Sequence, residues 1–570
     1  MKHPFVSKIP SNAHSEKLLK PIRAAAKTYL DTPVESLPYT QYVSYYKTGN
    51  RTAYEAIYTE HRRRLNVFTA MVLSAEEEKW LLGLEDILWA ICDEFTWALP
   101  AHVRGREQAD MDEHMLTVDL FAAETAFALS EVYALLGERL APLVRERVYR
   151  EIKRRIIAPY MEQNLSWPKN NWSAVCAGSV GSAMLLLGLE DTFERAKERL
   201  LRSMQDFLES YHDDGCCMEG VLYWGYGFGY FCFFAALVRE YSHGTVDLFK
   251  DEKVRRIASF RQKAFLHDDL IVPFADAPHN LNCHIGLNHF LAREYTEVTA
   301  PDERYEAILD DDTRYRFADF LRDFYWYDET QKPQQDKAET ACWEEAQWYI
   351  RKEKGFAFAC KGGDNDEPHN HNDIGGFVLL DGRAFIIDDL GWSEYLYGYF
   401  TDRRYEFLCT SSRGHSVPIV NGTYQQPGKQ YAAKLLEHDE KSCTLELSGA
   451  YDVGGLSALK RSFTVEKDGV TLTDTVSGED IQITERFVTR IEPVIEGNAV
   501  RIGQYRLICD TKADISTDIF VDISVSSEQF EPRLNICKME MRPVETAYLI
   551  DFRFSATSRV QQLRFTIQQV

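Results

Sequence analysis

The spacing of hydrophobic residues along the chain changes near residue 330. From about residue 15 to 325, apolar residues recur at intervals of three and four, which predicts amphipathic helices. Ser74 and Glu77 have the spacing of a capping box, which predicts a helix start just before one such stripe. The stripe consists of Leu81, Leu84, Leu88, Ile91 and Phe95. The pattern returns over residues 117–136 and from Pro142, so we expect antiparallel helical hairpins.

Beyond residue 338 the apolar residues alternate in short runs, which is typical of strands. The polar segment from Asp328 to Ala338 predicts a linker. Asp468 and Gly469 lie between two alternating arms and predict a hairpin turn. The expected strand runs are 355–360, 376–380, 384–387 and 459–474. The chain is therefore predicted to have a helical domain over residues 1–330 and an antiparallel β domain over 331–570.

Composition and charge narrow the possible partners. The 570 residues carry a formal charge of −23 at pH 7, so no basic surface for nucleic acid or an anionic membrane is expected. The longest nearly uncharged run, residues 223–238, is shorter than the ~20 residues of a membrane span. The N-terminal residues lack an apolar leader segment, which predicts a cytoplasmic protein, or a periplasmic or secreted one if a leader has been removed.

The densest group of reactive side chains lies where the β domain begins. A strand through residues 368–376 would place His369, His371 and Asp373 on one face. Imidazole and carboxylate groups arranged in this way can share a metal ion or a proton. Asp389 and His415 follow downstream, and two His and one Asp from separate segments suffice for a zinc-like ion. Surface histidines in polar loops are the alternative interpretation.

Two segments of the helical half present polar groups at a helix start or on one helix face. Asn170 and Asn171 precede the apolar run 173–187, where amide groups at a helix N-terminus can meet an anion. A simple N-cap is the alternative. Tyr223 and Tyr226 are spaced to share one helix face, and such pairs most often serve packing.

The order of these motifs resembles the heparinase II/III-like polysaccharide lyases. The resemblance covers about residues 80–425. It rests on Asn170-Asn171-Trp172, then the DGxxxEGxxYWxY pattern over 214–226, HNHNDxGxF over 369–377, a D-x-G at Asp389, and S-x-x-H ending at His415. The segments 97–102 and 119–125 also look like the helical domain of that family.

The resemblance implies a fold and a reaction. The expected fold is an incomplete (α/α) toroid followed by an antiparallel β-sandwich. The expected reaction is β-elimination on uronic-acid polysaccharides or their oligosaccharides. Heparan sulfate or heparin, chondroitin and hyaluronan are the expected substrates, with alginate as an alternative. The partner would thus be an acidic saccharide, with no nucleic acid and no membrane, and a homo-oligomer is left open.

The resemblance also implies residue roles. Asn171, with Asn170 as the adjacent alternative, would neutralise the sugar carboxylate, and Tyr223 and His369 would transfer the protons. His371, Asp389 and His415 would hold one divalent ion, zinc before manganese or calcium, in a mainly structural role. If His369 and His371 share a strand face, their two roles require adjoining sites or a looped segment.

Departures from the family pattern define further candidates. Trp172 stands where several relatives have His, so His102 is expected to compensate. Asp388 precedes Asp389 and is a possible additional metal ligand. Substrate contacts are also expected from Tyr226, Arg404 and Tyr405.

Two other functional classes remain open at this stage. A glycoside hydrolase on a similar helical toroid would use two carboxylates, for which Asp214 and Glu219 are the candidates. A carbohydrate-binding protein without catalysis would need no titratable groups.

Overall fold

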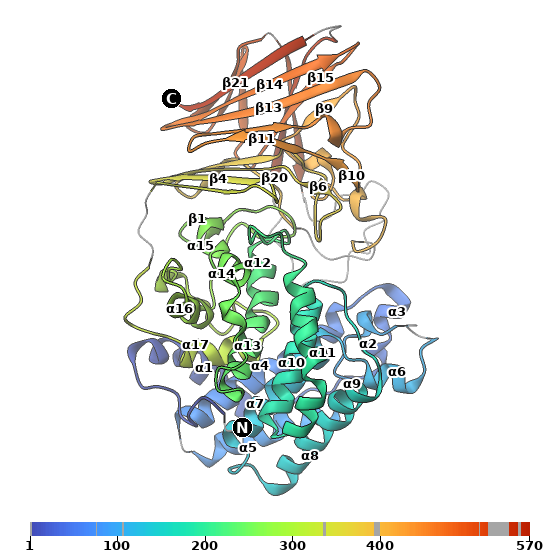
Figure 1. Cartoon of the computed structure of the whole chain (residues 1–570), viewed down its shortest axis with the longest axis vertical. Coiled ribbons are helices and arrows are strands. Elements are labelled where there is room, and N and C mark those ends of the chain that lie inside the picture. Colours follow the sequence, from blue (N-terminus) through green and yellow to red (C-terminus); the bar gives the residue numbers. More distant parts are fainter. Residues whose placement is uncertain are drawn as a thin grey trace.

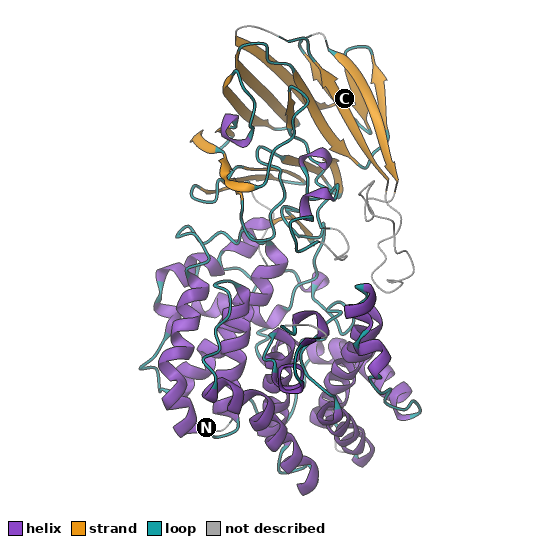
Figure 2. Ribbon diagram, turned by 90° about the vertical axis from the view of Figure 1, so that its right-hand side faces the viewer, coloured by secondary structure: helices purple, strands orange, loops and turns teal. Residues whose placement is uncertain are grey.

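The computed structural model has a helical half and a β half that lie end to end (Figure 1). The structure describes residues 3–75, 77–104, 108–333, 338–392, 399–511, 513–521, 546–556 and 560–570, with side chains of 514–521 left aside. The view turned by 90° shows the same separation, with helices at one end and sheets at the other (Figure 2). The segment from Asp328 to Ala338 connects the last helix of the first half to the first strand of the second, although residues 334–337 lie outside the described part.

The helical half is built from helices whose apolar faces form one large core, beside a smaller cluster that includes Tyr42, Tyr54 and Tyr58. Helix α10 packs against α7, α11 and α13, and α4 packs against α1 and α5. The longer helices are α1 (Ala13–Leu30), α4 (Thr52–Ser74), α5 (Glu78–Asp93), α7 (Leu120–Leu136), α8 (Pro142–Ile152), α10 (Asn171–Leu186), α11 (Glu190–Leu208), α13 (Gly229–Tyr241), α16 (Ile285–Glu294) and α17 (Phe317–Tyr325). The shorter ones are α2 (Tyr39–Tyr42), α3 (Ser44–Thr48), α6 (Met111–Leu116), α9 (Ala158–Glu162), α12 (Val221–Tyr223), α14 (Glu252–Ala258) and α15 (Phe260–Ala264).

The predicted capping box at Ser74 is wrong. Ser74 is the last residue of α4, and its hydroxyl donates to the Met71 carbonyl oxygen within that helix. Helix α5 has Glu77 at its N-cap position, without a side-chain hydrogen bond there. The apolar stripe of α5 is nevertheless buried as expected, with Leu84, Leu88 and Ile91 in the core. The sequence correctly indicated a boundary between two helices near Ser74. Ser74, however, ends the first helix, α4, and does not begin the second, α5.

The β half consists of antiparallel sheets. The first sheet has the strand order β3-β4-β5-β7-β8: Glu339–Trp343, Trp348–Glu353, Phe356–Lys361, Phe377–Asp381 and Ala384–Ile387. The second sheet orders β11-β12-β13-β14-β21-β18-β17-β16: Lys434–His438, Ser442–Glu446, Leu456–Glu466, Gly469–Gly478, Val560–Gln569, Tyr505–Cys509, Ala499–Ile502 and Pro493–Glu496. The third orders β19-β20-β15-β9: Asp514–Val521, Thr546–Arg553, Ile483–Thr489 and Pro418–Val420. The hairpin between β13 and β14 turns at Lys467 and Asp468, which confirms the predicted turn to within one residue.

The five-stranded sheet is buried on both faces and joins the two halves. Ile350, Ala357 and Val378 belong to the core of the helical half. Tyr349, Phe358 and Leu379 belong to the core of the β half, because side chains alternate across a strand. The Phe358 ring lies 5.1 Å from the ring of Phe463 in the eight-stranded sheet. The position of the β half on the helices is therefore fixed by packing as well as by the connecting chain.

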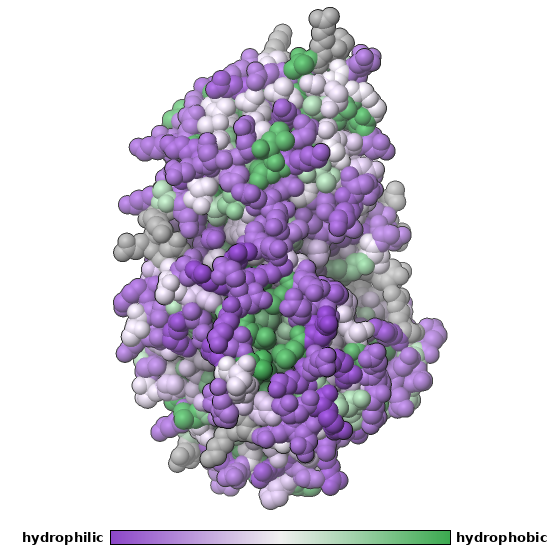
Figure 3. All heavy atoms as spheres, viewed as in Figure 1, coloured by the Kyte–Doolittle hydropathy of each residue, from purple (hydrophilic) through white to green (hydrophobic). Residues whose placement is uncertain are grey.

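One helical stretch, Val221–Tyr241, is long and apolar enough by length and composition to cross a membrane. In the structure 78% of its apolar window is buried, as is typical of the core helix of a globular protein. On the face drawn in Figure 3, hydrophilic side chains cover most of the surface, and apolar side chains gather in a hollow over the helical half and in a patch over the β half. The stretch Val221–Tyr241 is therefore part of the core of the helical half.

Candidate active site

The start of α10 separates the roles of its two asparagines. The Asn170 side chain accepts a hydrogen bond from the Trp172 amide at 3.0 Å, so Asn170 is the N-cap residue. Asn171 is the first residue of the helix and is 4% exposed. A Cβ atom at Gly227 would lie 3.0 Å from the Asn171 Cβ, so the absence of a side chain at Gly227 lets the segment after Tyr223 approach Asn171.

Tyr223 ends the short helix α12, after Gly220, whose φ of 91° suits glycine. A π-helical turn, Trp224–Phe228, then leads into α13. Such turns widen the helix and occur frequently at functional sites. The Tyr223 ring stacks on the His369 ring, with centroids 4.2 Å apart and planes at 30°. Two residues from opposite halves of the chain, which the sequence proposed as the proton-transfer pair, are therefore in contact.

His369 lies in a loop, which corrects the expectation of a strand. The segment lies between β6 (Asp364–Asn365) and β7, and His369 has a φ of 58°, a left-handed conformation that a strand residue does not adopt. The two alternatives that the sequence left open both hold. The segment is looped and the sites of His369 and His371 adjoin, because both imidazoles contact the same carboxylate.

That shared carboxylate is Asp276, which sequence reasoning missed. Its Oδ2 lies 2.7 Å from His369 Nδ1, and its Oδ1 lies 3.1 Å from His371 Nε2. Oδ1 also accepts from the Tyr399 hydroxyl at 2.6 Å and from Arg404 Nη2 at 2.8 Å. Burial alone would raise the pKa of Asp276, but Arg404 and the two imidazoles hold that pKa well below its usual value. Asp276 therefore remains ionised and fixes both histidine rings.

Glu219 faces the other side of the His369 ring. Its Oε2 lies 3.4 Å from His369 Nε2, while the residue is only 8% exposed. The pKa of Glu219 is raised, chiefly by burial, with the His369 charge acting in the opposite direction. From the sequence, Glu219 was a candidate only for the carboxylate pair of a hydrolase, together with Asp214. Asp214 instead accepts backbone amide hydrogen bonds from Cys216, Glu345 and Ala346, and so ties down the loop.

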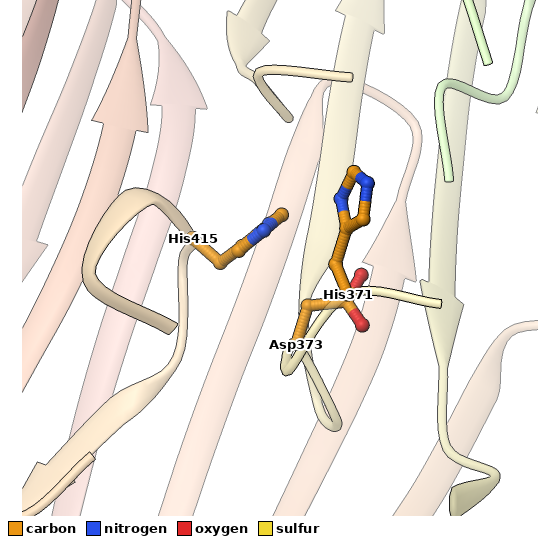
Figure 4. Close-up of side chains that lie close together, drawn as sticks. All are labelled: His371, Asp373 and His415. Carbon is orange, nitrogen blue, oxygen red and sulfur yellow. The ribbon is translucent and has the colours of Figure 1, made fainter. Parts of the chain in front are cut away.

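Three buried side chains lie together in the β half: His371, Asp373 and His415 (Figure 4). One donor atom from each lies within 4.8 Å of the others. His371 Nε2 is bound to Asp276, which leaves Nδ1 without a hydrogen-bond partner in the described part of the chain. Asp373 Oδ1 accepts from Lys361 Nζ at 2.7 Å, and its Oδ2 likewise has no partner there.

The fourth member of this group is Asp389, which contacts His415. His415 Nε2 lies 2.7 Å from the Cys409 carbonyl oxygen, an acceptor, so Nε2 carries a proton. His415 Nδ1 lies 3.0 Å from Asp389 Oδ2. Burial acts to lower the pKa of His415, but Asp389 raises it overall, and the pKa of Asp389 is itself lowered to about 2. In both His371 and His415, Nε2 is held by a protein oxygen, and Nδ1 lies on the side of the buried carboxylates. Histidines held in this way through one nitrogen are typical of divalent metal sites.

The remaining predicted residues fall into two groups. His102 bonds through Nδ1 to Asp119 Oδ2 at 2.7 Å, and its ring lies 5.1 Å from the Trp172 ring, so it adjoins α10 as expected. Tyr226 donates to Glu124, which lines a cavity of the helical half together with Arg316. Burial raises the pKa of Glu124 to about 7.

Arg404 and Tyr405 lie under the His369 loop. Arg404 is 8% exposed, and its guanidinium donates to Asp276 and to the carbonyl oxygens of His369 and Asn370. The Tyr405 hydroxyl donates to Asn370 Oδ1 at 2.7 Å. Asp388 is engaged by His279 and Arg490, which takes its carboxylate away from the metal-type donors. Arg404 is paired with Asp276 within the protein, and its contact with a substrate anion stays a prediction.

Comparison with solved structures identifies the architecture. A heparan sulfate lyase mutant from Pedobacter heparinus matches with a TM-score of 0.63 and 13% identity, over 100% of this chain and 85% of that one. A heparinase III structure matches with a TM-score of 0.58 and 15% identity, over 94% of this chain and 79% of that one. The chain has the fold of the heparinase-like lyases.

More distant polysaccharide lyases share the same architecture. The chondroitin AC lyase of Streptomyces coelicolor, solved with chondroitin sulphate, matches with a TM-score of 0.55 and 10% identity, over 98% of this chain and 80% of that one. No family model and no curated protein matches the sequence. The predicted fold class, a helical toroid followed by an antiparallel β-sandwich, is thus confirmed by solved structures that share 10 to 15% identity with this chain.

Proposed function

We propose that this protein is a polysaccharide lyase that cleaves uronic-acid-containing saccharides by β-elimination. The contact that carries the proposal is the stack of Tyr223 on His369, with Asp276 behind the imidazole. A tyrosine and an oriented histidine from two different domains supply the two proton-transfer groups that elimination needs. The fold shared with lyases acting on heparan sulfate and chondroitin supports the same chemistry.

The chemistry begins with the uronate carboxylate. The C5 proton is weakly acidic, because its removal adds a second negative charge to the enolate. Asn171, buried at the positive end of α10, is placed to donate to that carboxylate and stabilise the developing charge. Asn170 uses its Oδ1 to accept from the Trp172 amide as the N-cap, so Asn171 comes first for this role, and Asn170 stays the adjacent alternative because its Nδ2 is still a donor.

Tyr223 and His369 then exchange protons with the sugar. One group removes the C5 proton and the other protonates the O4 leaving group, which creates a double bond between C4 and C5. Asp276 on Nδ1 fixes the orientation of the imidazole and leaves Nε2, which faces Glu219, as the nitrogen that exchanges the proton. Either residue can be the base, and in a syn elimination Tyr223 can serve as both base and acid while His369 polarises or orients the sugar.

A divalent ion, zinc before manganese or calcium, fits the donors of His371, Asp389 and His415, with Asp373 as a further oxygen donor. Such an ion supplies cross-linking of three loops rather than an activated water. His371 and His369 share Asp276, so the donors that would hold the ion also determine the position of His369.

The substrate class is an acidic polysaccharide or its oligosaccharides. Glycosaminoglycans of the heparan, chondroitin or hyaluronan type come first, and alginate is the alternative. A glycoside hydrolase is less well supported, because Asp214 is bound to three backbone amides and cannot act with Glu219 as a pair.

Mass spectrometry of the products distinguishes these classes. A lyase acting on a uronate oligosaccharide yields a new non-reducing end that is lighter by one water than the hydrolysis product. We expect that lighter end with the parent protein. Products with the full mass of hydrolysis products would contradict the lyase proposal and support a hydrolase.

A further inference from the structure

We infer that Arg461 is a positioning residue, whose guanidinium fixes the His371 loop (residues 371–376) relative to the His415 loop (residues 412–417). It does so through one backbone carbonyl oxygen of each loop. The inference rests on the proposed lyase function, in which the two loops hold the ion and His371 shares a carboxylate with His369. It adds to the site a residue that lies on strand β13, outside both loops.

Arg461 is buried between two sheets of the β half. The residue is 0% exposed, and its Nε and Nη2 donate to Asp474 on β14 at 3.0 Å and 2.6 Å. Nη2 also donates to Glu485 on β15, 2.5 Å away, so the guanidinium connects the eight-stranded sheet to the four-stranded sheet. Nη1 instead donates to the carbonyl oxygens of Gly375, at 3.0 Å, and Ser416, at 3.2 Å.

Both carbonyl groups belong to residues close to the metal-type donors. Ser416 directly follows His415, and Gly375 comes two residues after Asp373, on the other loop of Figure 4. Gly375 has a φ of 84°, and a Cβ atom there would lie 2.5 Å from Leu447 Cδ1, so the backbone is packed too closely for a side chain. A movement of either carbonyl group would therefore displace a donor.

A guanidinium is suited to hold both carbonyl groups while it keeps its ion pair. The group is planar and has five N–H donors in a fixed arrangement, so the acceptors around it take fixed relative positions. A lysine ammonium is a point charge on a flexible stem and imposes no such arrangement. Burial raises the pKa of Glu485 well above its usual value, and the neighbouring Asp474 adds to this, so Arg461 and Asp474 form the charged pair.

The donors of the two loops are therefore brought together before an ion binds. Without this link the ion itself would have to order the loops, and the free energy of that ordering would weaken its binding. Contacts that orient metal ligands commonly account for about 10- to 100-fold in metal affinity. Arg461 should thus increase the affinity of the site although it contacts neither the ion nor the sugar.

The experiment measures zinc affinity, by competition with a chromophoric chelator, for the parent, Arg461→Lys and Arg322→Lys. Arg322 is the matched control, because it is 2% exposed and pairs with Glu131 at 2.9 Å, but lies on α17 in the helical half. Both substitutions keep a buried positive charge and remove the planar group.

We expect zinc to bind about 10- to 100-fold more weakly to Arg461→Lys and equally well to Arg322→Lys, while both metal-free variants melt at a lower temperature than the parent. Unchanged zinc affinity in Arg461→Lys, or an equal loss in Arg322→Lys, would overturn the inference. Neither outcome depends on turnover, so both are separate from the result of the lyase assay.

Hydrogen exchange in the metal-free parent is a second test, which needs no variant to fold. The probes are buried, hydrogen-bonded amides of the two loops: Ile374, Gly375, Gly376 and Val417. We expect them to exchange as slowly as the amides of β7, because Arg461 holds the loops without the ion. Much faster exchange would overturn the inference. If the parent binds no zinc, the proposed ion fails, and these exchange rates still decide on Arg461.

Discussion

At the scale of single residues, the two adjacent asparagines of α10 can be separated by experiment. Asn171→Ala removes the donor to the uronate carboxylate, so kcat/KM should fall by about 10²- to 10³-fold. Asn170→Ala removes the N-cap, so the free energy of unfolding should fall by about 1 kcal/mol. Steady-state rates and denaturant unfolding of both variants measure the two effects.

The opposite pattern would contradict this assignment. Suppose that Asn170→Ala loses most of its activity at the same substrate concentration relative to KM, while Asn171→Ala keeps its activity. The carboxylate contact then belongs to Asn170. A Trp172 variant is the reference for the cap. The cap hydrogen bond comes from the Trp172 backbone amide, so replacing the Trp172 side chain keeps that bond.

Several site residues could be predicted from the sequence because they lie in ordered motifs. Tyr223 and His369 were named from such motifs, and the structure places their rings 4.2 Å apart. Asp276 was missed because it stands alone in an apolar run, Ile271 to Ala277, with no motif around it. An acid within such a run signals a buried carboxylate that needs partners. The identity of those partners, all four of which lie more than 90 residues away, depends on the packing of the two halves.

At the scale of elements, loops rather than strands carry the β-half chemistry. Alternation in His369, His371 and Asp373 predicted a strand, but the positive φ of His369 and the short β6 before it break the ladder. A period of two in polar residues is weak evidence when no hydrophobic positions alternate with them. Strands β5, β7 and β8 of the five-stranded sheet, whose apolar positions set the pattern, were predicted to within about one residue, whereas β3 and β4 were not predicted.

The proposed ion should join these loops. His415→Ala removes one donor, so we expect lower metal content, a lower melting temperature and an activity loss of about 10- to 100-fold. His438→Ala is the matched control, because His438 lies on β11 and pairs only with exposed Glu344 among the contacts described for its side chain. Elemental analysis and melting curves with and without chelator measure the effect.

Substoichiometric metal in the parent protein would contradict the ion-binding proposal. A His415→Ala protein with an unchanged melting temperature and full activity would show that the loops keep their positions without the ion.

A charged contact between α16 and α17 gives the helical half a pH dependence. His284 Nδ1 lies 2.7 Å from Asp323 Oδ2, and the Gly286 amide donates to Asp323 Oδ1 at 2.9 Å. Burial acts to lower the pKa of His284, but Asp323 and Asp319 raise it to about 10. The folded-state pKa exceeds the unfolded value, so this stabilisation is complete below about pH 6.5 and is lost as the pH rises towards 10.

His284→Gln should therefore lower the free energy of unfolding at pH 6 by about 1.5 to 3 kcal/mol. The difference from the parent should shrink as the pH rises to 10, because the parent histidine loses its charge. Denaturant unfolding at several pH values measures it. A difference that is constant over this range would mean that the contact is not ionic.

At the scale of the whole molecule, the five-stranded sheet determines where the reaction can occur. Its two faces belong to different cores, which holds the His369 loop against the helices that carry Tyr223 and Asn171. The order of a helical half and a β half could be predicted from the change in hydrophobic period. The placement of the two halves relative to each other could not be predicted. It depends on which face of β4, β5 and β7 packs on the helices and which packs on the other sheets.

The central claim is that this composite site eliminates across a uronate linkage. The most direct measurement is the ultraviolet absorbance of the C4–C5 double bond during incubation with unsulfated chondroitin, hyaluronan, heparosan and alginate, for the parent and for Tyr223→Phe. We expect absorbance to rise with at least one polymer for the parent, and to rise at least about 10²-fold more slowly for Tyr223→Phe at an unchanged melting temperature. New reducing ends without absorbance, or no absorbance with any chain, would contradict the account.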